Sequence, residues 1–256
     1  MQISESHLSQ FKETTQNSRE WPGSAPKSWF AWVQKNTGPQ AAICKFKDTH
    51  LPHEQVSRAQ LKALVKNSAI DTLSCCIAIL AWGGMNRQHG TRLFSSSQEW
   101  VFIADEIRHG KINRAEAYQQ FAKLRAAKKL PGMGPAYFTK LIFFLMPDDQ
   151  SKGYIMDQWT SVSVNLLFEK PLIDTTVLKI KKQDGSFRVA EIVKDSNSHL
   201  QYEMFCQSVE WLAKKINVSP ELAEEMMFSE GRGNGTWRNY VIDQRSKNSK
   251  NRIQPT

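Results

Sequence analysis

Asp157 is the acidic residue whose surroundings in the sequence most favour chemistry. It follows the apolar segment Tyr154-Ile155-Met156 and precedes Gln158-Trp159, where the pattern predicts a new helix. A carboxylate at a helix amino end accepts hydrogen bonds from unpaired backbone N–H groups and stays ionised there. Such an anion could stabilise a developing positive charge or activate a water molecule. An ordinary helix-capping aspartate would show the same local pattern.

A glycine-rich turn precedes this aspartate, and Gly132 lies 25 residues before Asp157. Residues 130–134 read LPGMG, in which Pro131 fixes its own φ angle and the two glycines can adopt conformations that other residues avoid. Unpaired N–H groups at such a turn, together with the positive end of a following helix, form an anion site that suits a DNA phosphate.

Two helices are predicted on either side of the turn. Asn113 and Glu116 have the spacing of a capping box, which opens a helix or helix pair that runs to about Lys129. Pro135 fits the first position of a second helix, which is apolar on all sides and ends at about Met146. The pattern is therefore helix, glycine-rich hairpin, buried helix.

The LPGMG hairpin, the apolar helix and the aspartate at this spacing resemble the helix-hairpin-helix (HhH-GPD) DNA glycosylase superfamily. The segments GPAYFTKLIFF and IMDQW are similar to a bacterial subgroup described as oxoguanine-glycosylase-like, and the close match covers roughly residues 75–165. The resemblance implies a mainly α-helical fold of two lobes, with the hairpin and Asp157 on the cleft between them.

The resemblance also implies a reaction. A DNA glycosylase extrudes its target nucleotide and breaks the bond between base and deoxyribose, through a transition state with oxocarbenium character. Asp157 is the catalytic residue that the resemblance indicates. Bifunctional relatives carry a Lys where this sequence has Ala136, which favours a monofunctional enzyme that leaves an abasic site. Lys140 is a possible secondary nucleophile; otherwise it is structural or contacts a phosphate.

Further residues are candidates for holding DNA or the extruded base. Residues 83–90 and 231–240 are polar, glycine-rich segments that could line the site, or could be a helix-capping loop and a flexible tail. The DNA-binding candidates are Pro131, Gly132, Met133, Gly134, Lys140, Arg232 and Arg238. The base-pocket candidates are Trp82, Asn86, Arg87, His89, Gln158, Trp159 and Trp237.

The identity of the base stays open between two substrates. Similar antiviral enzymes remove hypermodified phage bases such as glucosylated hydroxymethylcytosine, and the subgroup description implies 8-oxoguanine repair. From another class, the chain could be a non-catalytic DNA-binding protein that kept the hairpin. No cofactor is expected except a monovalent cation at the hairpin, and the spacing of the four cysteines excludes the iron–sulfur cluster of some relatives.

The composition favours an anionic partner. Lys and Arg number 34 against 25 Asp and Glu, which gives a net charge of +9 and a pI near 9.4. A merely basic protein would show the same balance. No stretch reaches the roughly 20 apolar residues that span a bilayer, and the amino terminus is polar, so we expect a cytoplasmic protein without a membrane partner. We expect a monomer that binds double-stranded DNA carrying a modified base.

The rest of the chain predicts one glycosylase domain over residues 21–243. Residues 1–20 are expected to be weakly structured, and residues 244–256 to form a disordered basic tail. Alternating residues on either side of Asp184-Gly185 predict a β-hairpin insertion at about 175–193. Further helices are predicted at 53–66, 71–82, 96–109, 157–168, 199–216 and 219–228. Arg58, Lys62 and Lys66 are interpreted as a solvated basic face of the first of these.

Overall fold

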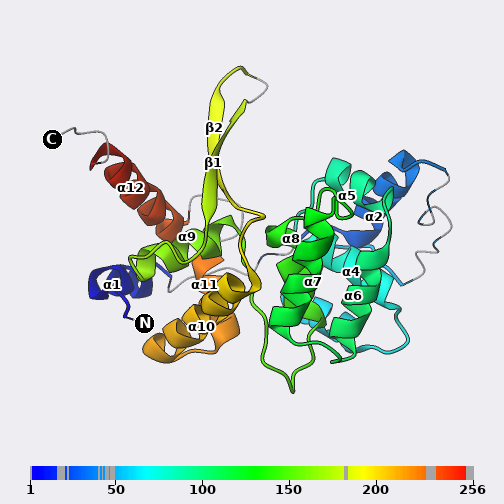
Figure 1. Cartoon of the computed structure of the whole chain (residues 1–256), viewed down its shortest axis with the longest axis horizontal. Coiled ribbons are helices and arrows are strands. Elements are labelled where there is room, and N and C mark those ends of the chain that lie inside the picture. The colour runs from blue at the N-terminus through cyan, green and yellow to red at the C-terminus, as the bar shows by residue number, and fades with distance from the viewer. Residues whose placement is uncertain are drawn as a thin grey trace.

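The computed structural model describes residues 2–15, 21, 23–39, 41, 43, 46, 50–181, 184–228 and 235–251 of the 256-residue chain. Within these residues the chain forms twelve α-helices and one antiparallel pair of strands, arranged in two lobes (Figure 1). The mainly helical fold expected from the sequence is confirmed. In this part of the chain no helix is both long and apolar enough to cross a lipid bilayer.

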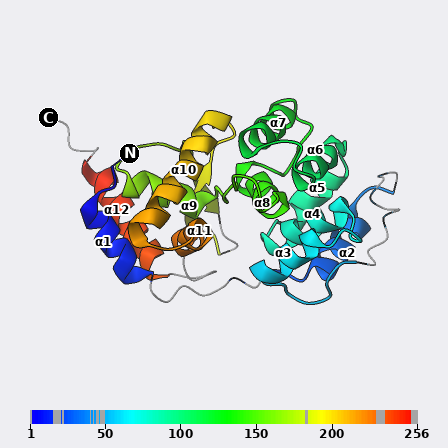
Figure 2. The same cartoon turned by 90° about the horizontal axis from the view of Figure 1, so that it is seen from below.

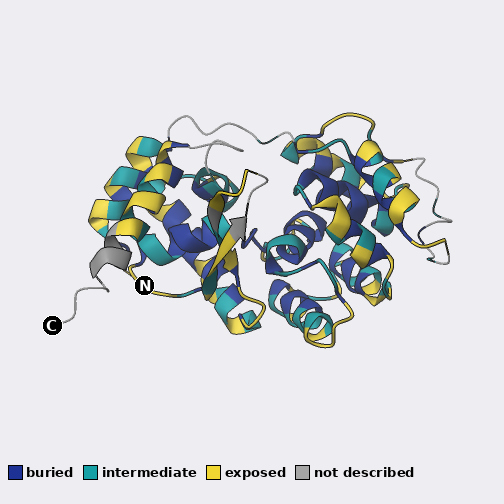
Figure 3. Ribbon diagram, turned by 90° about the horizontal axis from the view of Figure 1, so that it is seen from above, coloured by how far each residue is buried: buried dark blue, intermediate teal, exposed yellow. Residues whose placement is uncertain are grey.

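The first lobe contains seven consecutive helices, of which five surround the two apolar ones. They are α2 (Pro26–Asn36), α3 (Arg58–Lys66), α4 (Thr72–Trp82), α5 (Arg87–Phe94), α6 (Glu99–Arg108), α7 (Arg114–Ala126) and α8 (Pro135–Leu145). Helices α4 and α8 are buried over nearly their whole length, because both are apolar on all sides. The buried residues gather inside the lobe and the exposed ones on its outer faces (Figure 3).

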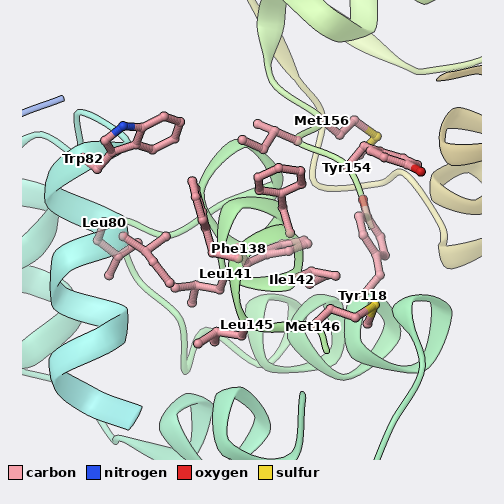
Figure 4. Close-up of a cluster of buried hydrophobic side chains, with 14 of the residues drawn as sticks. Leu80, Trp82, Tyr118, Phe138, Leu141, Ile142, Leu145, Met146, Tyr154 and Met156 are labelled. Atoms are coloured by element: carbon pink, nitrogen blue, oxygen red, sulfur yellow. The ribbon is translucent and has the colours of Figure 1, made fainter. Parts of the chain in front are cut away.

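The interior of this lobe holds the turn and its two helices in place. Figure 4 shows Phe138, Leu141 and Ile142 of α8 between α4, which contributes Leu80, and α7, which contributes Tyr118. Phe138 makes an edge-to-face contact with Tyr118, with ring centroids 5.0 Å apart. Close packing of this kind makes α8 a rigid support for whatever lies at its amino end.

The second lobe contains helices from both ends of the chain (Figure 2). It contains α1 (Glu5–Thr14), α9 (Gln158–Leu167), β1 (Thr175–Lys181), β2 (Phe187–Val193), α10 (His199–Ile216), α11 (Pro220–Phe228) and α12 (Thr236–Asn251). Two buried arginines of the first lobe tie the lobes together. Arg114 of α7 contacts Glu203 and Glu210 of α10, each at 2.5 Å, and Arg58 of α3 contacts Glu224 of α11 at 2.6 Å.

The two ends of the chain differ from the sequence-based expectation. Residues 5–14 form helix α1, and α12 continues to Asn251, where weakly structured segments were expected. The two helices stabilise each other: Phe11 packs edge-to-face on Trp237 with centroids 4.8 Å apart, and His7 hydrogen-bonds Tyr240 at 2.7 Å. Partners more than 200 residues apart leave no local signal in the sequence.

Most helix boundaries follow the expected capping signals. The capping box of Asn113 and Glu116 is present, and α10, α11 and both strands begin and end within one or two residues of the prediction. Two helices differ. Helix α3 begins at Arg58 and not near residue 53, because Ser57 and Gln60 form its capping box. Helix α5, capped by Asn86, was not predicted.

Candidate active site between the two lobes

A cavity of about 1390 Å³ lies between the lobes and receives side chains from both. We call it the inter-lobe cavity. Its lining includes the hairpin, the start of α8, the start of α9, one end of the β-hairpin and the buried side of α11. The lining residues used below are Arg58, Trp82, Gly83, His89, Pro131, Gly132, Gly134, Ala136, Tyr137, Lys140, Asp157, Gln158, Trp159, Thr176, Ile192, Lys194, Asp195, Glu224, Phe228 and Arg238.

Asp157 is held rigidly at the wall of this cavity. It is the amino-terminal cap of α9, and its Oδ1 accepts hydrogen bonds from the backbone N–H groups of Trp159 at 2.8 Å and Thr160 at 3.1 Å. The Thr160 hydroxyl accepts from the Asp157 N–H at 2.9 Å and donates to the Ile155 carbonyl at 2.7 Å. Only 7% of Asp157 is exposed, so the carboxylate has a fixed orientation in a desolvated setting.

The hairpin follows the expected helix, turn, helix order. Gly132 has φ of +77°, a conformation that favours glycine, and a Cβ there would lie 2.7 Å from the carbonyl oxygen of His89. Arg125 of α7 donates to the Leu130 carbonyl at 2.9 Å and stabilises the turn. Gly134 caps α8 with no side-chain acceptor of its own, and Pro135 occupies the first helical position. The amino end of α8 therefore faces the cavity with the positive end of its dipole.

Lys140 reaches the cavity from within α8. Its amine donates to the Ala136 carbonyl at 2.5 Å and lies 5.4 Å from the centre of the Tyr137 ring. Its aliphatic chain passes directly over Gly83, where a Cβ would lie 2.5 Å from Lys140 Cδ. Burial lowers the pKa of the Lys140 ammonium, and the negative charges of Asp157 and Glu224 act in the opposite direction.

A buried ion pair, missed by the sequence analysis, lies on the same wall. Arg58 is not part of a solvated face, because its guanidinium pairs with Glu224 and lies 4.9 Å from the centre of the Phe143 ring. Lys62 also pairs with an acid of α11, Glu221. Glu224 is completely buried, burial raises its carboxyl pKa, and its Oε1 has no hydrogen-bond partner.

The sequence offered one signal for Glu224. It lies beside Ala223 and three residues before Met227 on the buried face of α11, a position where an unpaired charge is costly. Its partner Arg58 is 166 residues away, so only the fold shows that the charge is paired.

Arg238 of α12 lines the cavity together with an aromatic side chain of α9 and one of α11. Its guanidinium lies 4.7 Å from the ring centres of both Trp159 and Phe228, and it donates twice to the Phe228 carbonyl, at 2.9 and 2.6 Å. Burial lowers its pKa, and the charge of Asp157 opposes that effect. Gln158 is oriented between its neighbours: its amide donates to the Glu191 carbonyl at 3.0 Å and accepts from the Trp159 indole at 2.9 Å.

The structure separates the predicted site residues into four groups, of which the last, the completely buried residues, follows below. The residues that line the cavity are Pro131, Gly132, Gly134, Lys140, Asp157, Arg238, Trp82, His89, Gln158 and Trp159. Asn86 and Arg87 are exposed outside that lining, where Asn86 caps α5 and Arg87 lies over the Trp32 ring. Arg232 lies outside the described residues.

Two expectations are corrected by burial. Trp237 is completely buried, and its indole N–H donates to Ser163 at 2.8 Å, so it is a core residue of the second lobe and not part of a base pocket. Met133 is likewise completely buried at the tip of the turn, so any DNA contact there comes from backbone and not from its side chain.

Comparison with known proteins adds one finding. A family model described as "Putative 8-oxoguanine DNA glycosylase OGG-like protein" matches residues 15–228. No curated protein and no solved structure matches the chain. The matched span includes the turn, Asp157 and Glu224, and ends before α12.

Proposed function

Because the chain belongs to this OGG-like glycosylase family, we propose that it is a monofunctional DNA N-glycosylase that removes a modified base and leaves an abasic site. The observation that carries the proposal is the position of Asp157. A desolvated carboxylate, oriented by two backbone N–H groups, lines a cavity whose adjacent wall is a helix-hairpin-helix turn. A purely structural capping aspartate has no need of such a cavity.

The two halves of the site have different roles. The backbone N–H groups at Gly132, Gly134 and the start of α8 bind phosphates beside the target nucleotide, which positions the duplex without reading its sequence. The target nucleotide turns out of the stack into the inter-lobe cavity. The Leu130 carbonyl already accepts from Arg125, and its second lone pair is available to the monovalent cation expected at the hairpin.

Asp157 acts on the deoxyribose of the extruded nucleotide. As the bond between C1′ and the base nitrogen breaks, the base leaves with the electron pair and the sugar gains positive charge. The carboxylate stabilises this charge through space and accepts a proton from the water that adds to C1′. The leaving base takes up a proton, so the products are free base and an abasic site. Because its hydrogen bonds hold the Asp157 carboxylate in place, little reorganisation accompanies the reaction.

The base lies against the wall formed by α11 and α12. Trp159 and Phe228 offer aromatic faces, and Arg238 between them stacks or donates to an acceptor. Glu224 is enclosed in this structure, so its unpartnered Oε1 accepts an amino or imino N–H of the base only after the side chains that cover it move. Cytosine-type and guanine-type bases both carry such donors.

The size and polarity of the cavity favour a bulky base, and the preferred substrate is glucosylated hydroxymethylcytosine in phage DNA. A volume of about 1390 Å³ exceeds the usual range of roughly 300–1,000 Å³ for small-molecule sites. Six Lys or Arg side chains and four carboxylates line the cavity. This polar lining suits a sugar better than a closed aromatic slot would. The second candidate is 8-oxoguanine, which the description of the family favours.

Mass spectrometry of bases released from a DNA panel tests the proposal. The panel contains oxidised, deaminated and alkylated DNA, and phage DNA with glucosylated hydroxymethylcytosine. Asp157→Asn should retain the capping hydrogen bonds and duplex binding while losing base release by about 10³-fold or more, since it removes the negative charge. Lys66→Met, an exposed position on α3 that does not line the cavity, is the control. Base release by Asp157→Asn at the wild-type rate would refute the role of Asp157, and tight duplex binding without any release would indicate a non-catalytic DNA-binding protein.

A further inference from the structure

Strands β1 and β2 form a two-stranded arm that projects beyond the helices of both lobes (Figure 1). Four large apolar side chains on it are exposed: Val177 (57%), Leu178 (42%), Phe187 (62%) and Ile192 (39%). An isolated β-hairpin is marginally stable in water, and its outer edges leave backbone groups unpaired. Exposed apolar side chains on such an element mark a contact surface.

The strand register divides the arm into two faces. Thr176 pairs with Ile192 and Leu178 with Ala190, and alternation places these four side chains on one face. Thr176 and Ile192 line the inter-lobe cavity, and we call their face the cavity face; on the other face only Val193, at the end of β2, lines it. Leu178 and Ala190 continue it outward, and the apolar strip therefore begins inside the candidate site and extends beyond it.

The opposite face of the arm makes an ion pair with α12, and its Val177 and Phe187 side chains stay exposed. Glu191, on that face, forms an ion pair with Arg245 of α12 at 2.8 Å and a hydrogen bond with the Thr175 hydroxyl. Val177 lies on this same face, directly across from Glu191 in the strand register. The cavity face is the one that continues outward from the lining of the candidate site.

The base of the arm is tied to the hairpin. Asp195, two residues after β2, pairs with Arg125 at 2.8 Å, and the same Arg125 donates to the Leu130 carbonyl. Asp195 Oδ1 also lies 3.2 Å from the position that a Cβ on Gly134 would occupy. One arginine thus fixes the arm relative to the turn that binds phosphate.

We propose that the cavity face of the arm contacts the DNA duplex beside the extruded nucleotide, which rests on the proposed glycosylase function. A two-stranded β-ribbon fits a DNA groove, where apolar side chains contact sugars and base edges. Lys194 lines the cavity at the base of the arm, and residues 175–193 carry four Lys or Arg against two acids. The arm lengthens the DNA interface outward from Asp157.

A pair of neighbouring substitutions tests this orientation. Leu178→Asp places a negative charge on the cavity face, and Val177→Asp places the same charge on the opposite face of the same strand. Both positions are exposed, so both variants should fold; Val177→Asp faces Glu191 across the strands and should lower the melting temperature slightly, which thermal unfolding measures. The probe is a fluorescent duplex with a central tetrahydrofuran abasic analogue, and affinity is read by anisotropy. Leu178→Asp should bind about tenfold or more weakly, because like charges at an interface repel, and Val177→Asp should stay within about threefold of wild type.

Each other outcome overturns the proposal in a distinguishable way. Wild-type affinity in both variants removes the arm from the interface and leaves the proposed glycosylase function intact, and an equal loss in both variants refutes the assignment of the contact to the cavity face. A wild-type protein that binds no duplex removes both proposals. Light scattering that finds a dimer, dissociated by Leu178→Asp, would identify the cavity face as an interface between copies of this chain.

Discussion

The amine of Lys140 donates a hydrogen bond to the carbonyl of Ala136, one turn earlier in α8, at 2.5 Å. Ala136 is the position at which bifunctional relatives carry their nucleophilic lysine. The side chain of Lys140 therefore bends back toward that position from one turn away, and Gly83 provides the space in which its aliphatic part lies. This relationship makes Lys140 the residue to examine when monofunctional and lyase mechanisms are compared.

Borohydride trapping should give no covalent adduct between the wild-type protein and abasic DNA. The Lys140 amine is hydrogen-bonded within its own helix, and no lysine occupies the usual position. However, burial lowers the pKa of the Lys140 amine, and an amine that attacks the sugar needs a lowered pKa. The trapping experiment therefore decides between the monofunctional and the lyase mechanism. An adduct that disappears in Lys140→Met would show that this lysine is the nucleophile of a lyase.

Lys140→Met should raise the melting temperature more at pH 7 than near pH 10.5. The Lys140 pKa is lowered in the folded protein from its usual value of 10.5, mainly by burial. The unfolded chain therefore binds this proton more readily, and stability falls as the pH drops below 10.5. Removing the amine removes that penalty.

The matched control for this pH series is Lys129→Met. Lys129 is half exposed and pairs with Glu99 on the surface, and its removal should change the free energy of unfolding by less than about 0.5 kcal/mol. If Lys140→Met raised the melting temperature equally at both pH values, the loss of stability could not be assigned to the buried charge of Lys140.

Gly132→Ala should destabilise the protein by about 1–3 kcal/mol and weaken duplex binding. A Cβ at Gly132 is strained by its φ of +77° and meets the His89 carbonyl oxygen at 2.7 Å. Gly134→Ala is the matched control, since Gly134 has φ of −89° and its Cβ would meet only Asp195 Oδ1, at 3.2 Å. Denaturant unfolding and anisotropy measure the two effects. Equal stability of the two variants would contradict this account of the turn.

Glu224→Ala should cost about 3–5 kcal/mol of stability, because it leaves Arg58 as a buried charge without its carboxylate partner. The double variant Arg58→Met, Glu224→Met should recover most of that loss, since buried ion pairs are often replaceable by apolar side chains. Urea unfolding of the two variants gives the comparison. If the double variant were as unstable as Glu224→Ala, the ion pair would stabilise the protein by more than neutralising its two buried charges.

Local signals in the sequence determined much of the fold and the centre of the site. The capping box at Asn113, the proline at the start of α8 and the alternation around Asp184-Gly185 each act over a few residues, and the structure has the corresponding elements. The prediction that Asp157 caps a helix was confirmed for the same reason, because its hydrogen-bond partners are Trp159 and Thr160.

Only the tertiary structure decided which of these residues share a cavity and which are core. Trp237 was a base-pocket candidate because it follows a glycine-rich segment, yet its partners Phe11 and Ser163 are 226 and 74 residues away and enclose it completely. Arg58 was interpreted as solvated, and Glu224, on a helix of the other lobe, makes it a buried wall of the site. Helix α1 likewise depends on α12. Burial and charge pairing are set by partners distant in the chain, and a local pattern carries no record of them.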